Sequence, residues 1–123
     1  MEEYQKSGTN NILKSTFVKY CSSFIQPEVE KIINDNGDKL VVLDFFATWC
    51  GPCRAIAPKF EELSTKHTTV VLAKVDVDVN EEAAAKYNVT AMPTFVFFKG
   101  GKEIDKLVGA DETKLEEMIT KHK

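Results

Sequence analysis

Residues 40–53 read LVVLDFFATWCGPC, an apolar run that leads directly into two cysteines separated by two residues. Up to residue 46 the run is apolar at every position except Asp44. A strand with apolar residues on both faces is typical of the centre of a sheet that helices cover on both sides. From Cys50 to about Lys66, apolar residues recur at helical spacings. The stretch therefore predicts a buried strand that delivers a pair of cysteines to the start of a helix.

The rest of the chain alternates between strand-like and helix-like segments. Pro27 suits the first turn of a helix that Gly37 ends, and Gly100-Gly101 separates two strand-like segments as in a hairpin. Helices between successive strands predict parallel pairing, and the hairpin adds an antiparallel pair. We expect the α/β class, with a mixed five-stranded sheet flanked by helices on both faces. The expected strands are 16–20, 40–46, 70–77, 94–98 and 103–108, and the expected helices are 27–36, 50–66, 81–87 and 111–121.

The amino-acid composition limits the classes of protein to which the chain can belong. With 123 residues, 43% hydrophobic and 28% charged, the chain has the balance of a single soluble globular domain. A formal net charge of −3 argues against nucleic-acid binding, and no apolar run is long enough to span a bilayer. We expect a flexible lead-in at residues 1–15 and one domain over residues 16–123.

The first residues bear on localisation. Residues 1–15 are polar, include Glu2 and Glu3, and contain neither an apolar signal-peptide run nor an arginine. We therefore expect a cytoplasmic protein, although a chain already stripped of its signal would look similar.

The chain has three cysteines: Cys50 and Cys53 form a C-x-x-C pair, and Cys21 stands alone. Three cysteines cannot build the disulfide framework of a small secreted protein. A C-x-x-C pair in a reducing compartment indicates redox chemistry or metal binding, and packing is the remaining alternative. A tetrahedral metal site needs four ligands, yet His67 and His122 are isolated and there is no second C-x-x-C. We expect redox chemistry, with no metal and no bound cofactor.

The position of the pair gives its members different predicted roles. Side chains at i and i+3 share a helix face, and a modest adjustment brings two such sulfurs within disulfide distance. Cys50 faces the unpaired N–H groups and the positive end of the helix dipole, which favour the reactive thiolate. Cys53 lies one turn further along and is expected to be less exposed. Cys50 is therefore the predicted nucleophile, and Cys53 the predicted resolving thiol.

Residues 47–53, ATWCGPC, resemble the active-site segment of the thioredoxin family, and the resemblance runs from about Thr16 to the C-terminus. It implies a thioredoxin-like fold and a general protein-disulfide reductase that carries electrons by dithiol–disulfide exchange at Cys50 and Cys53. It also implies that an NADPH-dependent thioredoxin reductase recycles the oxidised form. The clients it implies are disulfide-containing proteins such as peroxiredoxin, ribonucleotide reductase and methionine sulfoxide reductase.

Asp44 is the polar exception in the apolar strand. A buried carboxylate is costly unless it is partnered or protonated, so Asp44 is either a functional acid or a strand-end acid turned toward solvent. In the functional interpretation it accepts the proton of Cys53, directly or through water. The resemblance favours this interpretation, because the family carries its buried acid at the matching place.

By strand alternation, Lys74 and Asp78 fall on the same face of a predicted strand and its end. That face could simply be exposed to solvent. The resemblance implies instead that Lys74 lies beside Asp44, where its charge favours the ionised acid. It also implies that Asp78 accepts a hydrogen bond from the indole N–H of Trp49 and so supports that side chain.

A docking surface for clients is also implied. From sequence alone a cis bond before Pro93 is uncommon, but the resemblance implies a cis-proline opposite the cysteines. Backbone groups beside such a bond can pair with an extended substrate. Gly109 suits the surface because a side chain there would obstruct a partner, although every member could also serve packing alone. The expected docking residues are Trp49, Gly51, Pro52, Ala91, Met92, Pro93, Gly109 and Ala110.

The sequence departs from the family pattern at a few positions. Ala91 stands where some animal members have a cysteine, so that route to disulfide dimers is missing, and we expect a monomer. Cys21 is interpreted as a small packing residue, with a regulatory thiol as the alternative. Phe46 stands where bacterial members often have tryptophan.

Two rival functions stay open at this point. An oxidase or isomerase of a secretory compartment would use the same chemistry in the opposite direction, although Gly51 and Pro52 argue against it. A binding module would dock partners without turnover, and its docking would survive replacement of both cysteines by serine.

Overall fold

The computed structural model describes residues 19–20 and 26–123; the expected lead-in at 1–15 and Cys21 lie outside the described residues. Within these described residues, five strands and four helices follow one another in the order β1, α2, β2, α3, β3, α4, β4, β5, α5. The strands are β1 (Lys19–Tyr20), β2 (Val41–Phe46), β3 (Val71–Asp76), β4 (Thr94–Lys99) and β5 (Lys102–Val108). The helices are α2 (Gln26–Asp35), α3 (Gly51–Lys66), α4 (Glu81–Lys86) and α5 (Glu112–His122).

The strands form one mixed sheet in the order β1-β3-β2-β4-β5. β1 and β2 both pair in parallel with β3, whereas β4 pairs antiparallel with β2 and with β5. The expected mixed five-stranded sheet is confirmed. Residues 16–18 of the expected first strand lie outside the described residues, and the other predicted boundaries differ from the observed ones by at most one residue.

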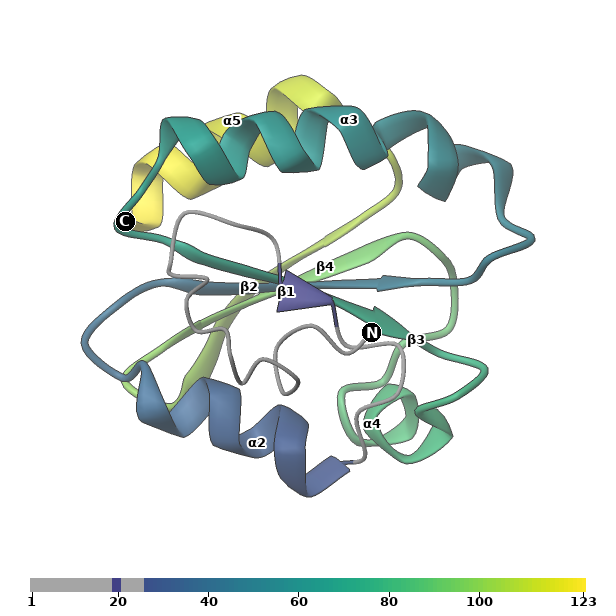
Figure 1. The fold of residues 1–123 in the computed structure, drawn as a ribbon, viewed down its shortest axis with the longest axis horizontal. Helices are drawn as coiled ribbons and strands as arrows, with labels where there is room; N and C mark the ends of the chain where they lie inside the picture. The colour runs from purple at the N-terminus through teal and green to yellow at the C-terminus, as the bar shows by residue number, and fades with distance from the viewer. Residues whose placement is uncertain (1–18, 21–25) are drawn as a thin grey trace.

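Helices cover both faces of the sheet. α3 and α5 lie on one side, and α2 and α4 lie on the other (Figure 1). Successive β2 side chains alternate between the two sides: Val42 packs with residues of α3 and α5, and Leu43 packs with residues of α2 and α4. All six residues of β2 are buried, as a strand covered on both faces requires. None of the described helices is both long and apolar enough to cross a membrane.

The β4–β5 hairpin turns at Gly100 and Gly101, with φ values of 66° and 80°. Both glycines occupy the left-handed region that side chains disfavour, which explains why the turn needs them. Because the turn is this tight, pairing continues to Lys99 and Lys102, slightly beyond the predicted strand ends.

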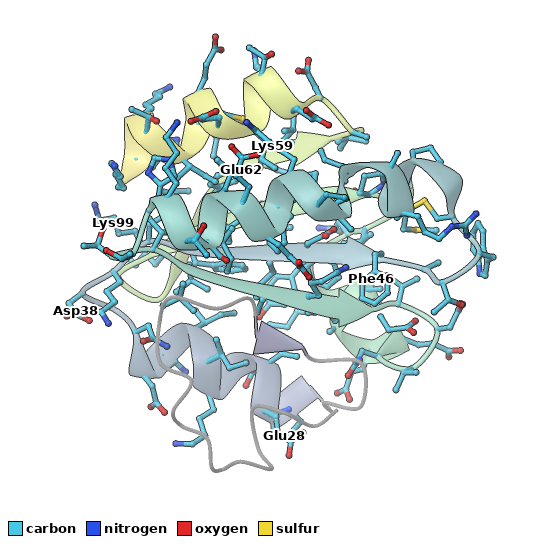
Figure 2. The ribbon with its side chains drawn as sticks, turned by 45° about the horizontal axis from the view of Figure 1, so that its top comes forward. Glu28, Asp38, Phe46, Lys59, Glu62 and Lys99 are labelled. Carbon is cyan, nitrogen blue, oxygen red and sulfur yellow. A yellow bond between two sulfur atoms is a disulfide. The ribbon has the colours of Figure 1, made fainter. Side chains whose placement is uncertain are left out.

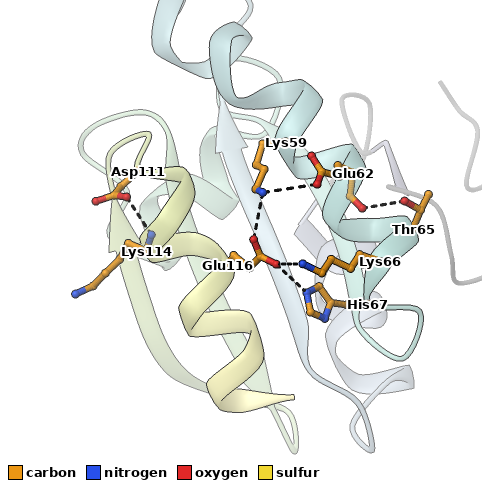
Figure 3. A network of polar contacts seen from close by, with 8 residues as sticks. All are labelled: Lys59, Glu62, Thr65, Lys66, His67, Asp111, Lys114 and Glu116. Carbon is orange, nitrogen blue, oxygen red and sulfur yellow. Dashed lines mark hydrogen bonds and ion pairs between the residues drawn. The ribbon is translucent and has the colours of Figure 1, made fainter.

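A polar network joins α3 to α5, the two helices on one side of the sheet (Figure 3). Glu116 of α5 is its hub: the carboxylate pairs with Lys59 at 3.1 Å and with Lys66. The buried His67 lies 3.9 Å from the same carboxylate. The network helps to hold in place the helix that begins at the cysteine pair.

Candidate active site

Cys50 and Cys53 lie where the end of β2 meets the start of α3, and Figure 2 shows their disulfide at that end of the helix. Their Cα atoms are 5.3 Å apart. Cys50 is the N-cap of α3, and its sulfur accepts a hydrogen bond from the Cys53 N–H at 3.2 Å. The two residues are 5% and 3% exposed, so their exposure is nearly equal. Their positions in the helix, rather than their exposure, distinguish their predicted roles. An N–H donor at the Cys50 sulfur stabilises negative charge there, as the predicted nucleophile requires.

Asp44 is fully buried, at 0% exposure, so the alternative of an acid turned toward solvent is wrong. Strand alternation directs Asp44 to the same side as Val42, the side that α3 covers. Neither carboxylate oxygen has a hydrogen-bond partner among the described residues. Burial raises the pKa of Asp44 to about 7, and the Lys74 ammonium opposes that rise. At neutral pH this carboxyl can therefore both accept and release a proton.

Lys74 is the residue of β3 directly opposite Asp44 in the parallel pair. It is half-buried, and its ammonium lies 4.8 Å from the centre of the Phe46 ring. The implied placement of Lys74 beside Asp44 is therefore present, and the side chain is half-buried rather than fully solvated.

A small, mostly apolar pocket of about 260 Å³ opens beside the cysteine pair. Cys53 and Lys74 both line it, so the resolving sulfur and the cation next to Asp44 share one space. Phe46, Ala47 and Ala57 supply its apolar wall, and Thr48 and Arg54 complete the lining. A space of this size holds several waters beside Cys53 and Lys74, whereas Asp44 lies behind the pocket wall and does not line it.

Trp49 is 64% exposed beside the cysteines, and its indole Nε1 donates to Asp78 Oδ2 at 2.9 Å. Asp78 is itself held in a turn, because its backbone N–H donates to Asp76 Oδ1 at 2.9 Å. The implied support of Trp49 by Asp78 is thus present, and it fixes a large apolar surface in solvent.

The Met92–Pro93 bond is cis, as the resemblance implied. Met92 packs against the cluster that contains Cys50 and Cys53, so this loop lies next to the sulfurs. The Thr94 hydroxyl donates to the Ala91 carbonyl at 2.6 Å, which braces the loop from the β4 side.

Gly109 donates its N–H to the Pro93 carbonyl at 2.9 Å, which brings the end of β5 to the proline. Its φ of 109° lies in a region that side chains disfavour, and a Cβ there would meet nothing within 4 Å. The chain itself therefore demands this glycine for its backbone angle, a reason independent of the predicted room for a partner. The remaining docking candidates, Gly51, Pro52, Ala91 and Ala110, are exposed, and their role stays a prediction.

One residue of the site was missed by sequence reasoning. Arg54 donates from Nη1 to the Thr48 carbonyl at 2.9 Å. Its position directly after Cys53 was the available signal, but the sequence does not show where a long side chain reaches.

No group of three or more histidine, cysteine or acidic side chains that could hold a metal ion occurs within residues 19–20 and 26–123.

The family model described as Thioredoxin matches residues 21–121. The chain belongs to the thioredoxin family. It is 42% identical over 111 residues to "Thioredoxin-1" of Caenorhabditis elegans, covering 90% of this chain and 96% of that protein. The X-ray structure of Fasciola hepatica thioredoxin superposes with a TM-score of 0.82 at 59% identity, covering 86% of this chain and all of that one.

Another similar structure is described as the structural basis of the thiol-resolving mechanism in yeast mitochondrial 1-Cys peroxiredoxin via glutathione/thioredoxin systems. It superposes with a TM-score of 0.77 at 35% identity and covers 88% of this chain and 98% of that chain. With its cysteine pair joined at the start of α3, this thioredoxin-family chain is a thiol–disulfide oxidoreductase. Its substrates, as for the family in general, are disulfide-containing proteins, and it has reductase partners.

Proposed function

We propose that this protein works in the reducing direction, as a general protein-disulfide reductase and electron carrier of the cytoplasm. The observation that carries the proposal is Asp44, a fully buried carboxyl with a pKa of about 7 on the α3 side of the sheet. A base with that pKa can deprotonate a resolving thiol at neutral pH, and reduction of a client is complete only when that thiol reacts.

The first step is attack by the Cys50 thiolate on a client disulfide. A Cys50–client mixed disulfide forms, and the other client sulfur leaves as a thiolate that takes a proton from solvent. The exposed Trp49 and the Met92–Pro93 loop next to the sulfurs hold the client during this step.

The second step is attack by Cys53 on the Cys50 sulfur. The Cys53 thiol gives its proton to the Asp44 carboxylate, directly or through water, and the Cys50–Cys53 disulfide forms. The remaining client sulfur leaves as a thiolate, so the client gains the two electrons that the cysteine pair has lost.

The oxidised protein then needs a source of two electrons and two protons. An NADPH-dependent thioredoxin reductase supplies them in this proposal, and its flavin and nicotinamide belong to that enzyme. Peroxiredoxin, ribonucleotide reductase and methionine sulfoxide reductase are the proposed clients. The similarity to the solved structure from the study of yeast 1-Cys peroxiredoxin thiol resolution supports peroxiredoxin as a client.

The test is the reduction potential of the Cys50–Cys53 pair, obtained by equilibrating the pure protein with graded ratios of reduced and oxidised glutathione. We expect the pair to stay oxidised except in strongly reducing buffers, as for an electron donor. Reduction near the poise of an oxidising lumen would overturn both the direction and the compartment. A variant with both cysteines replaced by serine separates turnover from docking, because a binding module would keep its partners.

A further inference from the structure

Arg54 makes a hydrogen bond that joins the residues on either side of the cysteine pair in the chain. Its guanidinium donates to the Thr48 carbonyl, two residues before Cys50, and Arg54 itself directly follows Cys53. The hydrogen bond therefore brackets residues 49–53 from both ends. Arg54 is also the only arginine among the 123 residues.

Other hydrogen bonds also hold this segment, among them a backbone bond from the Arg54 N–H to the Cys50 carbonyl at 3.2 Å. The Cys50 N–H donates to the Ala47 carbonyl at 3.1 Å, which forms a turn within the segment. The Trp49 indole is held by Asp78, which lies beyond the end of β3. The Arg54 side chain instead comes from α3, the same helix that carries Cys53. It thus ties the Cys50 side of the pair to the Cys53 side without using sulfur.

We propose that Arg54 is a positioning residue that keeps Cys50 and Cys53 aligned for the resolving step while the disulfide between them is open. This inference rests on the proposed function, since it concerns the rate at which a mixed disulfide is resolved.

The physical reason is the effective concentration of one sulfur at the other. Attack of Cys53 on Cys50 is fast only if the backbone around both sulfurs holds them within reach. In the dithiol and mixed-disulfide states the S–S bond no longer provides that constraint. The side-chain Arg54–Thr48 hydrogen bond then adds to the backbone bond between Arg54 and Cys50 in keeping the segment in the conformation in which the two Cα atoms lie 5.3 Å apart.

Rapid mixing of the reduced protein with the aromatic disulfide dithiobis(nitrobenzoate) resolves the two steps. Attack by Cys50 releases one nitrothiobenzoate ion and forms a mixed disulfide. Attack by Cys53 then releases the second ion and forms the Cys50–Cys53 disulfide, so one dithiol yields two coloured thiolates and two protons. The first and second releases report the two steps separately.

The variants are Arg54→Met, which keeps the apolar stem but loses the donor and charge, and Arg54→Lys, which keeps charge and a donor. Lys114→Met, at an exposed position of α5, is the control for loss of one surface cation. We expect Arg54→Met to slow the second release roughly three- to tenfold, the range for loss of one hydrogen bond. Arg54→Lys should recover part of that loss, and Lys114→Met should match the wild type.

The pH dependence separates positioning from a simple charge effect. If Arg54 positions the segment, the second-release rate reaches a lower plateau at high pH, where Cys53 is fully ionised. If Arg54 acts only through its charge, the plateau stays at the wild-type value and the midpoint moves, and our inference is wrong. An unchanged second release in Arg54→Met also overturns it.

Failure of the proposed function would look different. A wild-type potential typical of an oxidising lumen would remove the proposed direction, whereas the comparison between wild type and Arg54→Met would still measure the effect of Arg54 on disulfide closure.

Discussion

Asp44 and Lys74 lie directly opposite each other in the parallel β2–β3 pair, on the face of the sheet that α3 covers. Asp44 is fully buried and Lys74 half-buried. The ammonium offsets only part of the cost of burying the carboxylate, because the pKa of Asp44 remains raised to about 7. This pair combines a cost in folding free energy with a proposed base for the resolving cysteine, and each aspect leads to a prediction.

Asp44→Asn should stabilise the oxidised protein at alkaline pH. The folded chain binds the Asp44 proton more tightly than the unfolded chain does, because the pKa of Asp44 is near 3.8 when the chain is unfolded. Wild-type stability from this group is therefore present below pH 3.8 and is lost as pH rises through about 7. We expect the variant to gain on the order of 4 kcal/mol at pH 8 and almost nothing near pH 3.5.

Denaturant unfolding of both proteins across that pH range is the measurement. The control is Glu81→Gln, because Glu81 is exposed. Asp111→Asn would be unsuitable, because Asp111 caps α5. A gain that does not depend on pH would contradict a raised pKa of Asp44.

Lys74→Met should shift the pH profile of the resolving step. Without the ammonium, the pKa of Asp44 rises further, so less carboxylate is present at pH 7 to accept the Cys53 proton. We expect the second nitrothiobenzoate release to slow at pH 7 and to recover toward the wild-type plateau near pH 9. Asp44→Asn, which has no carboxylate at any pH, should not recover by this route. A profile for Lys74→Met that coincides with the wild type would show that the pair does not govern the step.

Asp78→Ala should weaken client docking while leaving the sulfur chemistry intact. Loss of the 2.9 Å hydrogen bond frees the Trp49 indole, which is 64% exposed and then samples several orientations. For a folded disulfide-bonded substrate we expect KM to rise roughly three- to tenfold with little change in kcat. Glu81→Gln serves as the matched control for a nearby lost charge. An equal fall in kcat would place Asp78 in the chemistry instead.

Much of the fold and site followed from the sequence because local signals were strong. Glycines at 100 and 101 predicted the hairpin, and one acid in an apolar strand predicted a buried carboxyl. Alternation alone did not say whether Lys74 faces solvent or Asp44, since that depends on the order of strands in the sheet. Only the resemblance implied that Lys74 lies beside Asp44.

Other contacts lay beyond any periodic pattern. Trp49 and Asp78 are 29 residues apart, and their hydrogen bond depends on how the loops after β2 and β3 meet at the carboxyl ends of these strands. The reach of Arg54 back to Thr48 depends on a side-chain rotamer, which no spacing rule encodes. Sequence patterns predict which face a residue occupies, whereas the end of a long side chain is set by the assembled surface.

Glu116→Gln should lower the melting temperature by loosening α5 from α3. The Lys66 and Lys59 ammonium groups hold the pKa of Glu116 at about 2, below its ordinary value of 4.5. Stability from this carboxylate is therefore present above pH 4.5 and is lost as pH falls toward 2. Because the network is partly exposed and screened by salt, we expect a loss of about a few degrees at pH 7 and low ionic strength. Calorimetry across pH and salt is the measurement, with the outward-facing Glu117→Gln as the control on the same helix. A difference from the wild type that persists unchanged at pH 2 and in molar salt would mean that the ion pairs do not join the two helices.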